Sequence, residues 1–147
     1  MAPLKKALKT MSKNNPKLLI GNRILGPAHP VYVIAEACDN HLGSTDVAKE
    51  MIERSHDAKC SAIKFQHHLP DEEMLPNVPM SDNFSEPLYD FLKRYALTLS
   101  QHEELKKYCE RIGIQYLCTP FSFRAAEELA GIGVDAFKIG SGEMTDI

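Results

Sequence analysis

The most constraining feature of this sequence is the regular alternation of short apolar runs with segments of helical periodicity. Four runs have the composition of buried strands, at residues 31–35, 61–66, 114–118 and 134–139. Between them, apolar residues recur at the spacing of helices with one buried face, over residues 44–58, 100–112 and 122–130. Strands and helices that alternate in this way form right-handed βαβ units around a parallel sheet. We therefore expect an α/β fold.

Local signals mark where the helices begin. Ser44 and Ser122 are expected to cap the first and last of them. Ser100 and Glu103 have the spacing of a capping box. The stretch at residues 67–85 contains three prolines and is too long for a plain connection, which is typical of a functional loop. A short helix is expected just after this stretch.

The N-terminal part of the chain has a different character. Residues 1–16 carry scattered lysines but neither the apolar segment nor the cleavage site of a signal peptide, so we expect a flexible leader there. The segments Leu-Leu-Ile at residues 18–20 and Arg-Ile-Leu at residues 23–25 flank a Gly-Asn pair and predict a small β-hairpin. Residues 17–147 are expected to form the folded part.

Composition excludes several classes of protein. The 147 residues carry a net charge of −3, so no basic surface predicts binding to nucleic acid or to an anionic membrane. No apolar run approaches the roughly 18 residues that span a bilayer. The four cysteines have no CxxC spacing and are expected to be free thiols of a cytoplasmic protein: Cys38, Cys60, Cys109 and Cys118.

Two architectures fit the alternation, an open doubly wound sheet and part of a (β/α)8 barrel. The segment after the first strand has no GxGxxG fingerprint, which disfavours a nicotinamide-dependent oxidoreductase. Polar residues instead follow or end each strand, as in barrel enzymes: Glu36, Lys64, Gln66, Thr119, Lys138, Ser141 and Glu143. We therefore expect the first half of a TIM-type barrel, about four βα units, preceded by the hairpin.

The residues at the strand ends suit a small phosphorylated anion. Lys64 and Lys138 occupy strand positions, where an unpaired charge is costly. The Gly-Ser-Gly sequence around Ser141 can turn backbone N–H groups toward an anion. Glu36 and Glu143 could move protons, with Gln66 orienting hydroxyl groups. The alternative is an ordinary strand-to-loop turn with salt-bridged lysines at the surface.

The six histidines do not predict a metal site. Asn40 and His41, in the loop after the first strand, could line the rim of the site. His67 and His68 are adjacent, so they would point in opposite directions from an extended chain. The remaining three are expected at the surface: His29, His56 and His102.

Four motifs in order are similar to those of one known family. They are Ile34-Ala35-Glu36 with Asn40-His41-Leu42-Gly43, Ile63-Lys64-Phe65-Gln66, Cys118-Thr119-Pro120-Phe121-Ser122, and Phe137-Lys138-Ile139-Gly140-Ser141-Gly142-Glu143. Together they resemble the N-acetylneuraminate (sialic acid) synthase family over residues 18–147. Each motif is weak alone, whereas the ordered set is specific.

The resemblance implies condensation of phosphoenolpyruvate with N-acetylmannosamine or a related N-acyl hexosamine, giving a nine-carbon 2-keto-3-deoxy sugar acid and phosphate. It also implies a divalent metal, Mn²⁺ or Mg²⁺, whose ligands are expected on later strands outside this chain. A full-length family member would be a homodimer with a further C-terminal antifreeze-like domain. Activity of this chain by itself is left open.

The motif match also implies roles for individual residues. Phosphoenolpyruvate would be held by Lys64, Thr119, Lys138 and Ser141. Glu36 and Gln66 would face the sugar or a metal-bound water, and Glu143 would handle protons.

One departure leaves the acceptor sugar open, because residues 37–39 read Ala-Cys-Asp where many relatives have Ile-Gly and an apolar residue. Two alternatives remain: a legionaminate- or pseudaminate-type synthase, and a non-catalytic half-barrel that only binds ligand or self-associates.

Overall fold

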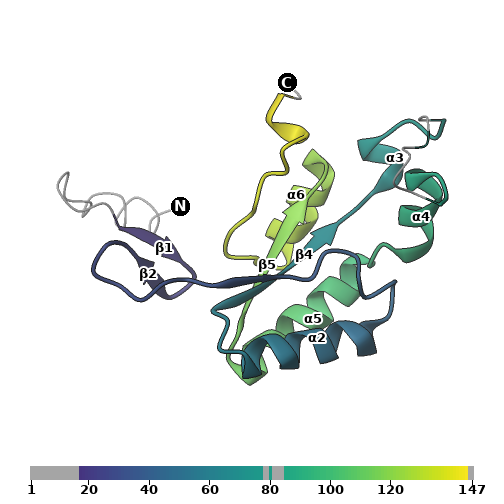
Figure 1. Ribbon diagram of the computed structural model, residues 1–147. Coiled ribbons are helices and arrows are strands. Elements are labelled where there is room, and N and C mark those ends of the chain that lie inside the picture. The colour runs from purple at the N-terminus through teal and green to yellow at the C-terminus, as the bar shows by residue number, and fades with distance from the viewer. Residues whose placement is uncertain (1–16, 78–79, 81–84, 146–147) are drawn as a thin grey trace. The chain divides into compact units, whose positions relative to one another are not determined.

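The computed structural model describes residues 17–77, 80 and 85–145 (Figure 1). The chain divides into two compact units, residues 1–32 and 33–147. In the first unit, β1 (Leu18–Ile20) and β2 (Arg23–Leu25) pair antiparallel around a turn in which Gly21 has a φ of 57°. This confirms the expected hairpin. The expected leader, at residues 1–16, lies outside the described residues.

The second unit contains a parallel sheet in the order β3 (Ile34–Glu36), β4 (Ala62–His67), β5 (Gln115–Pro120). Its register places Glu36 opposite Lys64 and Gln66 opposite Thr119. Polar residues from three strands are therefore aligned at one end of the sheet. This is the parallel topology that the alternation predicted.

The two outer strands are shorter than expected. The expected strand at 134–139 is reduced to one parallel bridge between Cys118 and Phe137. The expected strand at 31–35 begins only at Ile34, and Val31 and Val33 are exposed rather than buried on both faces. Each segment pairs on one side only among the described residues, so neither has the two neighbours that make a strand fully buried.

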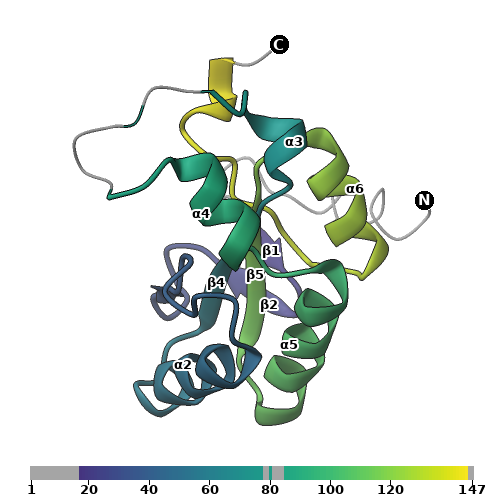
Figure 2. The ribbon, with the colours of Figure 1, turned by 90° about the vertical axis from the view of Figure 1, so that its right-hand side faces the viewer.

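Three longer helices connect the strands: α2 (Thr45–Asp57), α5 (Leu99–Ile112) and α6 (Phe123–Gly131). The connection between β4 and α5 contains two shorter ones, α3 (Pro70–Glu73) and α4 (Leu88–Tyr95), and a 3-10 turn, η1 (Glu143–Thr145), lies near the C-terminus. α2 and α5 lie side by side in both ribbon views (Figures 1 and 2). Among the described helices, none has the length and apolar character needed to cross a membrane.

The helix caps partly follow the sequence signals. Ser44 and Ser122 accept hydrogen bonds from backbone N–H groups of the helices that follow them, as predicted. The capping box of α5 is formed by Thr98 and Gln101, so the prediction of Ser100 and Glu103 was wrong. The helix begins earlier than expected, which places Glu103 beyond the cap, where it pairs with a lysine one turn later.

The hydrophobic core lies on one face of the sheet. Ile63 and Phe65 of β4 point into it, and α2, α5 and α6 cover them with the fully buried side chains of Ile52, Leu105 and Leu129. Since side chains alternate along a strand, Lys64 and Gln66 point to the opposite face. All three long helices thus pack on one side, as in the wall of a barrel.

Candidate functional site

Three polar side chains from three strands meet on the sheet face opposite the core. Lys64 is only 7% exposed, and its Nζ donates to Glu36 Oε2 in an ion pair. The same Nζ lies 3.4 Å from Oγ1 of Thr119, which is buried. The buried ammonium thus has a carboxylate on one side and a hydroxyl on the other. The structure therefore brings together three of the predicted site residues.

Lys138 is placed next to this group by the backbone. Its N–H donates to the Cys118 carbonyl at 3.2 Å, and the bridge between Cys118 and Phe137 puts Lys138 beside Thr119. Side chains at paired positions of a parallel sheet point to the same face. Both Lys138 and Ser141 are exposed. Two lysines therefore flank Thr119, one buried and one open to solvent.

Glu143 folds back against the glycine-containing turn before it. Its Oε2 is buried without a hydrogen-bond partner among the described residues. A Cβ atom added to Gly140 would lie 1.8 Å from that oxygen and 3.3 Å from the Phe121 ring. Only glycine leaves room for the carboxylate here. The turn thus holds one Glu143 carboxylate oxygen away from solvent with its acceptor capacity unused.

A cavity of 530 Å³ lies beside Glu143, of a size that holds small metabolites. Its polar lining includes Asp39, Asn40, Gln66, His68, Glu73 and Glu143. Its apolar lining comes mainly from the β4–α5 connection: Met74, Leu88, Phe91 and Leu92. The long proline-containing stretch therefore builds one wall of the cavity. Of the predicted site residues, Asn40, Gln66 and Glu143 line it.

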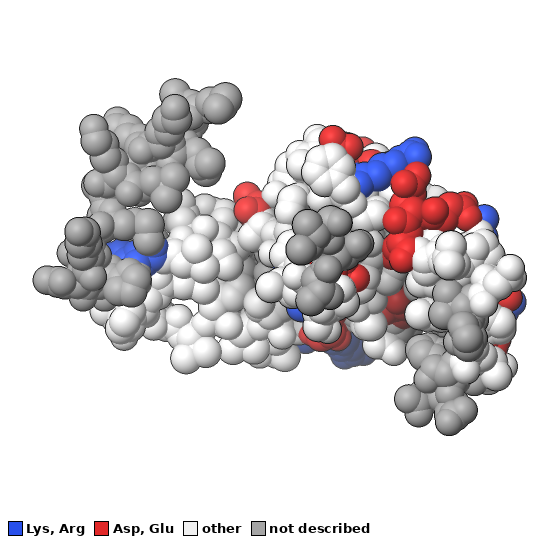
Figure 3. All heavy atoms as spheres, turned by 90° about the horizontal axis from the view of Figure 1, so that it is seen from above, with Lys and Arg blue, Asp and Glu red and all other residues white. Residues whose placement is uncertain are grey.

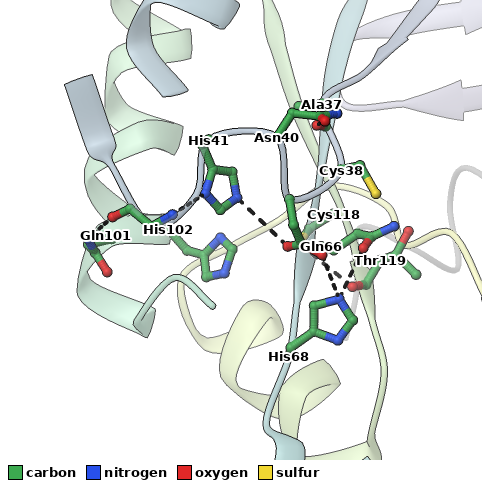
Figure 4. A network of polar contacts seen from close by, with 12 residues as sticks. Ala37, Cys38, Asn40, His41, Gln66, His68, Gln101, His102, Cys118 and Thr119 are labelled. Atoms are coloured by element: carbon green, nitrogen blue, oxygen red, sulfur yellow. Dashed lines mark hydrogen bonds and ion pairs between the residues drawn. The ribbon is translucent and has the colours of Figure 1, made fainter. Parts of the chain in front are cut away.

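His68 is the most highly connected side chain in this cavity, and sequence reasoning missed its role. Its Nε2 lies 3.0 Å from Gln66 Oε1 (Figure 4). The same Nε2 lies 3.4 Å from Asp39 Oδ2, and Nδ1 lies 3.0 Å from both Glu73 carboxylate oxygens. The ring stacks on Phe121 at 4.3 Å. Burial opposes the charged form, but hydrogen bonds to Asp39 and Glu73 outweigh it and raise the His68 pKa to about 9. The period of two along β4 was the available signal, because it puts His68 on the same face as Gln66.

The loop that carries Asp39 has a constrained backbone. Cys38 and Leu42 have φ values of 51° and 46°, which are uncommon for residues other than glycine. Asn40 Nδ2 donates to the Ala37 carbonyl at 2.9 Å. Local hydrogen bonds thus hold the loop in one conformation.

The structure places His41 differently from the rim position that the sequence suggested. It is 1% exposed, packs against the Phe65 ring and accepts a hydrogen bond from the Gly43 N–H at Nδ1. Burial lowers its pKa. The His41 side chain therefore turns toward the core, whereas Asn40 lines the cavity. The predicted role of His41 in substrate binding stays a prediction.

A second histidine group lies between the sheet and the helices. His67 Nε2 is 2.9 Å from Glu128 Oε2, and the His67 ring packs edge-on against His102. His102 Nδ1 lies 2.6 Å from the Tyr116 hydroxyl. Burial lowers the pKa of both histidines, that of His102 strongly. The expectation of a surface His102 was wrong, although its spacing from Leu105 places it on the apolar stripe of α5.

The expected divergence of His67 and His68 is confirmed, since one faces the helices and the other the cavity. Within the part of the chain that the structure describes, no group of three or more His, Cys, Asp or Glu side chains is arranged to hold a metal ion. On the face seen from above, acidic side chains gather with basic ones beside them (Figure 3). In the site itself, Lys64 and His68 each pair with carboxylates.

Comparison with known proteins agrees with this geometry. The NeuB family matches residues 51–147. The chain is 32% identical to human N-acetylneuraminate-9-phosphate synthase over 133 residues, covering 87% of this chain and 37% of that protein. It is 30% identical to N,N'-diacetyllegionaminic acid synthase of Legionella pneumophila, covering 83% and 36%. The chain thus spans about a third of the length of these relatives.

The fold matches solved structures as well. A crystal structure of the N-acetylneuraminic acid (sialic acid) synthetase of Leptospira borgpetersenii, in complex with citrate, superposes with a TM-score of 0.75 at 30% identity. The match covers 90% of this chain and 44% of that one. Parallel strands, helices on one face and polar residues at the strand ends define part of a β/α barrel. The chain belongs to the NeuB family.

Proposed function

We propose that this chain forms the phosphoenolpyruvate-binding part of a synthase that condenses phosphoenolpyruvate with an N-acyl hexosamine, with N-acetylmannosamine as the first candidate. The observation that carries the proposal is the buried ammonium of Lys64 held between Glu36 and Thr119. A buried lysine with a single partly exposed carboxylate partner is suited to an anionic ligand. Family membership supports the same reading.

The remaining residues can be given roles by position. Lys138, exposed beside Thr119, and the exposed Ser141 three residues further along the chain would bind the phosphate or carboxylate of phosphoenolpyruvate. Glu143, buried next to the cavity, would accept a proton or a hydroxyl hydrogen bond during the reaction. Gln66 would bind the acceptor sugar from the cavity wall.

The proposal extends to a metal ion and to the assembly. Among the described residues, no group of three or more His, Cys, Asp or Glu side chains could hold a metal ion. The ligands of Mn²⁺ or Mg²⁺ would therefore lie elsewhere, and the residue roles given above do not depend on the ion. A homodimer in the cytoplasm, acting on small molecules, is part of the proposal. Mn²⁺ or Mg²⁺, when bound, would polarise the acceptor aldehyde.

Titration calorimetry with phosphoenolpyruvate tests the binding role. Lys64→Met should weaken binding at least about tenfold, because a charge-assisted hydrogen bond is lost. Lys107→Met is the matched control, since Lys107 also pairs with a glutamate but lies exposed on α5. Equal affinities in the three proteins, or no binding to the wild type, would contradict the proposal.

The second candidate is a synthase for a legionaminate-type sugar, favoured by the nearly equal identity to the Legionella relative. The product mass after incubation with phosphoenolpyruvate and different N-acetyl hexosamines, one at a time, distinguishes the two. A preference for a diacetamido sugar would replace the first candidate with the second. A chain that binds ligand but yields no product would support the non-catalytic alternative.

A further inference from the structure

Both ring nitrogens of His68 have polar partners. One carboxylate, Glu73, faces Nδ1, and a second, Asp39, faces Nε2. Both carboxylates are largely buried, with side-chain exposures of 4% and 14%. A neutral imidazole has one N–H group, so one of the two carboxylates would then face a nitrogen lone pair. Only the doubly protonated ring satisfies both sides.

That protonation state determines how the Gln66 amide is oriented. The amide lies 3.0 Å from His68 Nε2, which donates. An N–H donor requires the carbonyl oxygen of Gln66 at this position, because its NH2 group cannot accept. The NH2 group is then left for the cavity that Gln66 lines. Gln66 is thereby restricted to acting as a donor toward a ligand.

We propose that His68 is a positioning residue, held doubly protonated between Asp39 and Glu73, that fixes the Gln66 amide with its NH2 group toward the cavity. The ligand group opposite Gln66 must then be a hydrogen-bond acceptor, such as a carbonyl or hydroxyl oxygen of an N-acyl sugar. This last point rests on the proposed function, whereas the arrangement of the three side chains around His68 does not.

The surroundings of His68 support a ring that stays charged near neutral pH. Phe121 stacks on one face at an interplanar angle of 17°. The neighbouring histidines, His41 and His67, both have lowered pKa values from burial and are neutral there. The two carboxylates are therefore the only charged groups among the described residues that face the ring directly.

Nuclear magnetic resonance of the 147-residue chain with ¹⁵N-labelled histidine and glutamine tests this arrangement. In the wild type, both His68 ring nitrogens should stay protonated to about pH 8, with a midpoint near 9. The Gln66 side-chain amide resonances should shift with the same midpoint, which a merely structural histidine would not cause. A His68 midpoint at or below 6.5, or a Gln66 amide that does not follow it, would overturn the proposal.

Glu73→Gln sharpens the test, because it keeps the shape of the side chain and removes one negative charge. It should lower the midpoints of His68 and Gln66 together. Glu72→Gln, on the same short helix but partly exposed and directed to Arg124, should leave both midpoints unchanged. Midpoints that fall equally in both variants would also count against the proposal.

Binding of N-acetylmannosamine separates the positioning role from the proposed function. Wild-type affinity should be constant between about pH 6.5 and 8, whereas the affinity of Glu73→Gln should fall about fivefold as His68 loses its proton and releases Gln66. An equally flat profile in Glu73→Gln would overturn the positioning role. Absence of sugar binding in every protein would contradict the proposed acceptor, while the resonance data would still decide the orientation of Gln66.

Discussion

The two faces of the parallel sheet use histidine in opposite ways. On the face covered by helices, His67 and His102 are buried with lowered pKa values and bond to Glu128 and Tyr116. On the other face, His68 is buried between two carboxylates with its pKa raised to about 9. Adjacent residues of one strand thus differ in charge because the strand pleat sends them into different surroundings.

The difference shows how one strand serves stability and chemistry together. The helix-covered face keeps its two histidines neutral and contains the apolar core. The opposite face holds the ion pair of Lys64 with Glu36, and the cavity is lined by His68 with its two carboxylate partners. Changes on the first face should therefore alter stability, and changes on the second should alter ligand binding.

The largest expected effect is on the helix-covered face. Leu105→Ala removes a fully buried side chain of α5 and should lower the free energy of unfolding by about 2–5 kcal/mol. Urea denaturation measures this change. Leu75→Ala, at a position that is 77% exposed, is the control and should change stability by less than about 0.5 kcal/mol. A similar loss in both would mean that this face is not the stabilising one.

The pH dependence of stability should have opposite signs for the two faces. Because His67 and His102 have lowered pKa values when folded, the unfolded chain binds more protons below about 6.5, and stability should fall there as pH falls. His68 has a raised pKa, so its contribution is complete below 6.5 and is lost as pH rises to about 9. Denaturation midpoints between about pH 5 and 9.5 measure both.

Two histidine substitutions test the loss of stability expected below about pH 6.5. His102→Asn can still accept a hydrogen bond from the Tyr116 hydroxyl but does not titrate, so it should reduce the loss of stability in acid. His56→Asn, at a partly exposed site, should leave the profile unchanged. Identical acid branches in the wild type and His102→Asn would break the proposed contrast between the faces.

The smallest expected effect on stability is on the cavity face. Gly140→Ala introduces a methyl group where the Glu143 carboxylate lies, and this side chain can swing away at a cost of about 1 kcal/mol or less. Phosphoenolpyruvate binding measured by calorimetry should nevertheless weaken. Gly131→Ala, at the end of α6 and outside the turn that contains Ser141, also meets nothing within 4 Å and is the matched control. Unchanged binding in both would remove Glu143 from the site.

The sequence predicted the parallel sheet and the placement of its polar strand ends, because both depend on local periodicity. Glu36, Lys64 and Thr119 were grouped correctly, since residues at the ends of parallel strands share one edge. His102 was misplaced because its polarity outweighed its position on the apolar stripe of α5. Only tertiary contacts reveal that Tyr116 gives it a partner.

The hydrogen-bonding partners of His68 could not be predicted from the sequence, for a different reason. Asp39 and Glu73 lie 29 and 5 residues away in sequence and come from a loop and a four-residue helix that no periodicity marks. The start of α5 was mispredicted for a local reason. Thr98 and Ser100 are both acceptable caps, and the reciprocal hydrogen bonds between Thr98 and Gln101 form at the first.

Gln101, the second residue of the α5 capping box, also forms a hydrogen bond outside the helix. The Gln101 side chain accepts hydrogen bonds from Thr98 with its oxygen, and donates with its nitrogen to the Gly43 carbonyl at 3.3 Å. That carbonyl belongs to the loop that presents Asp39 to the cavity. The Gln101 amide therefore connects the first turn of α5 to a loop that forms part of the cavity wall. A substitution in the first turn of α5 would therefore shift this loop and change ligand preference, although no residue that contacts the ligand is altered.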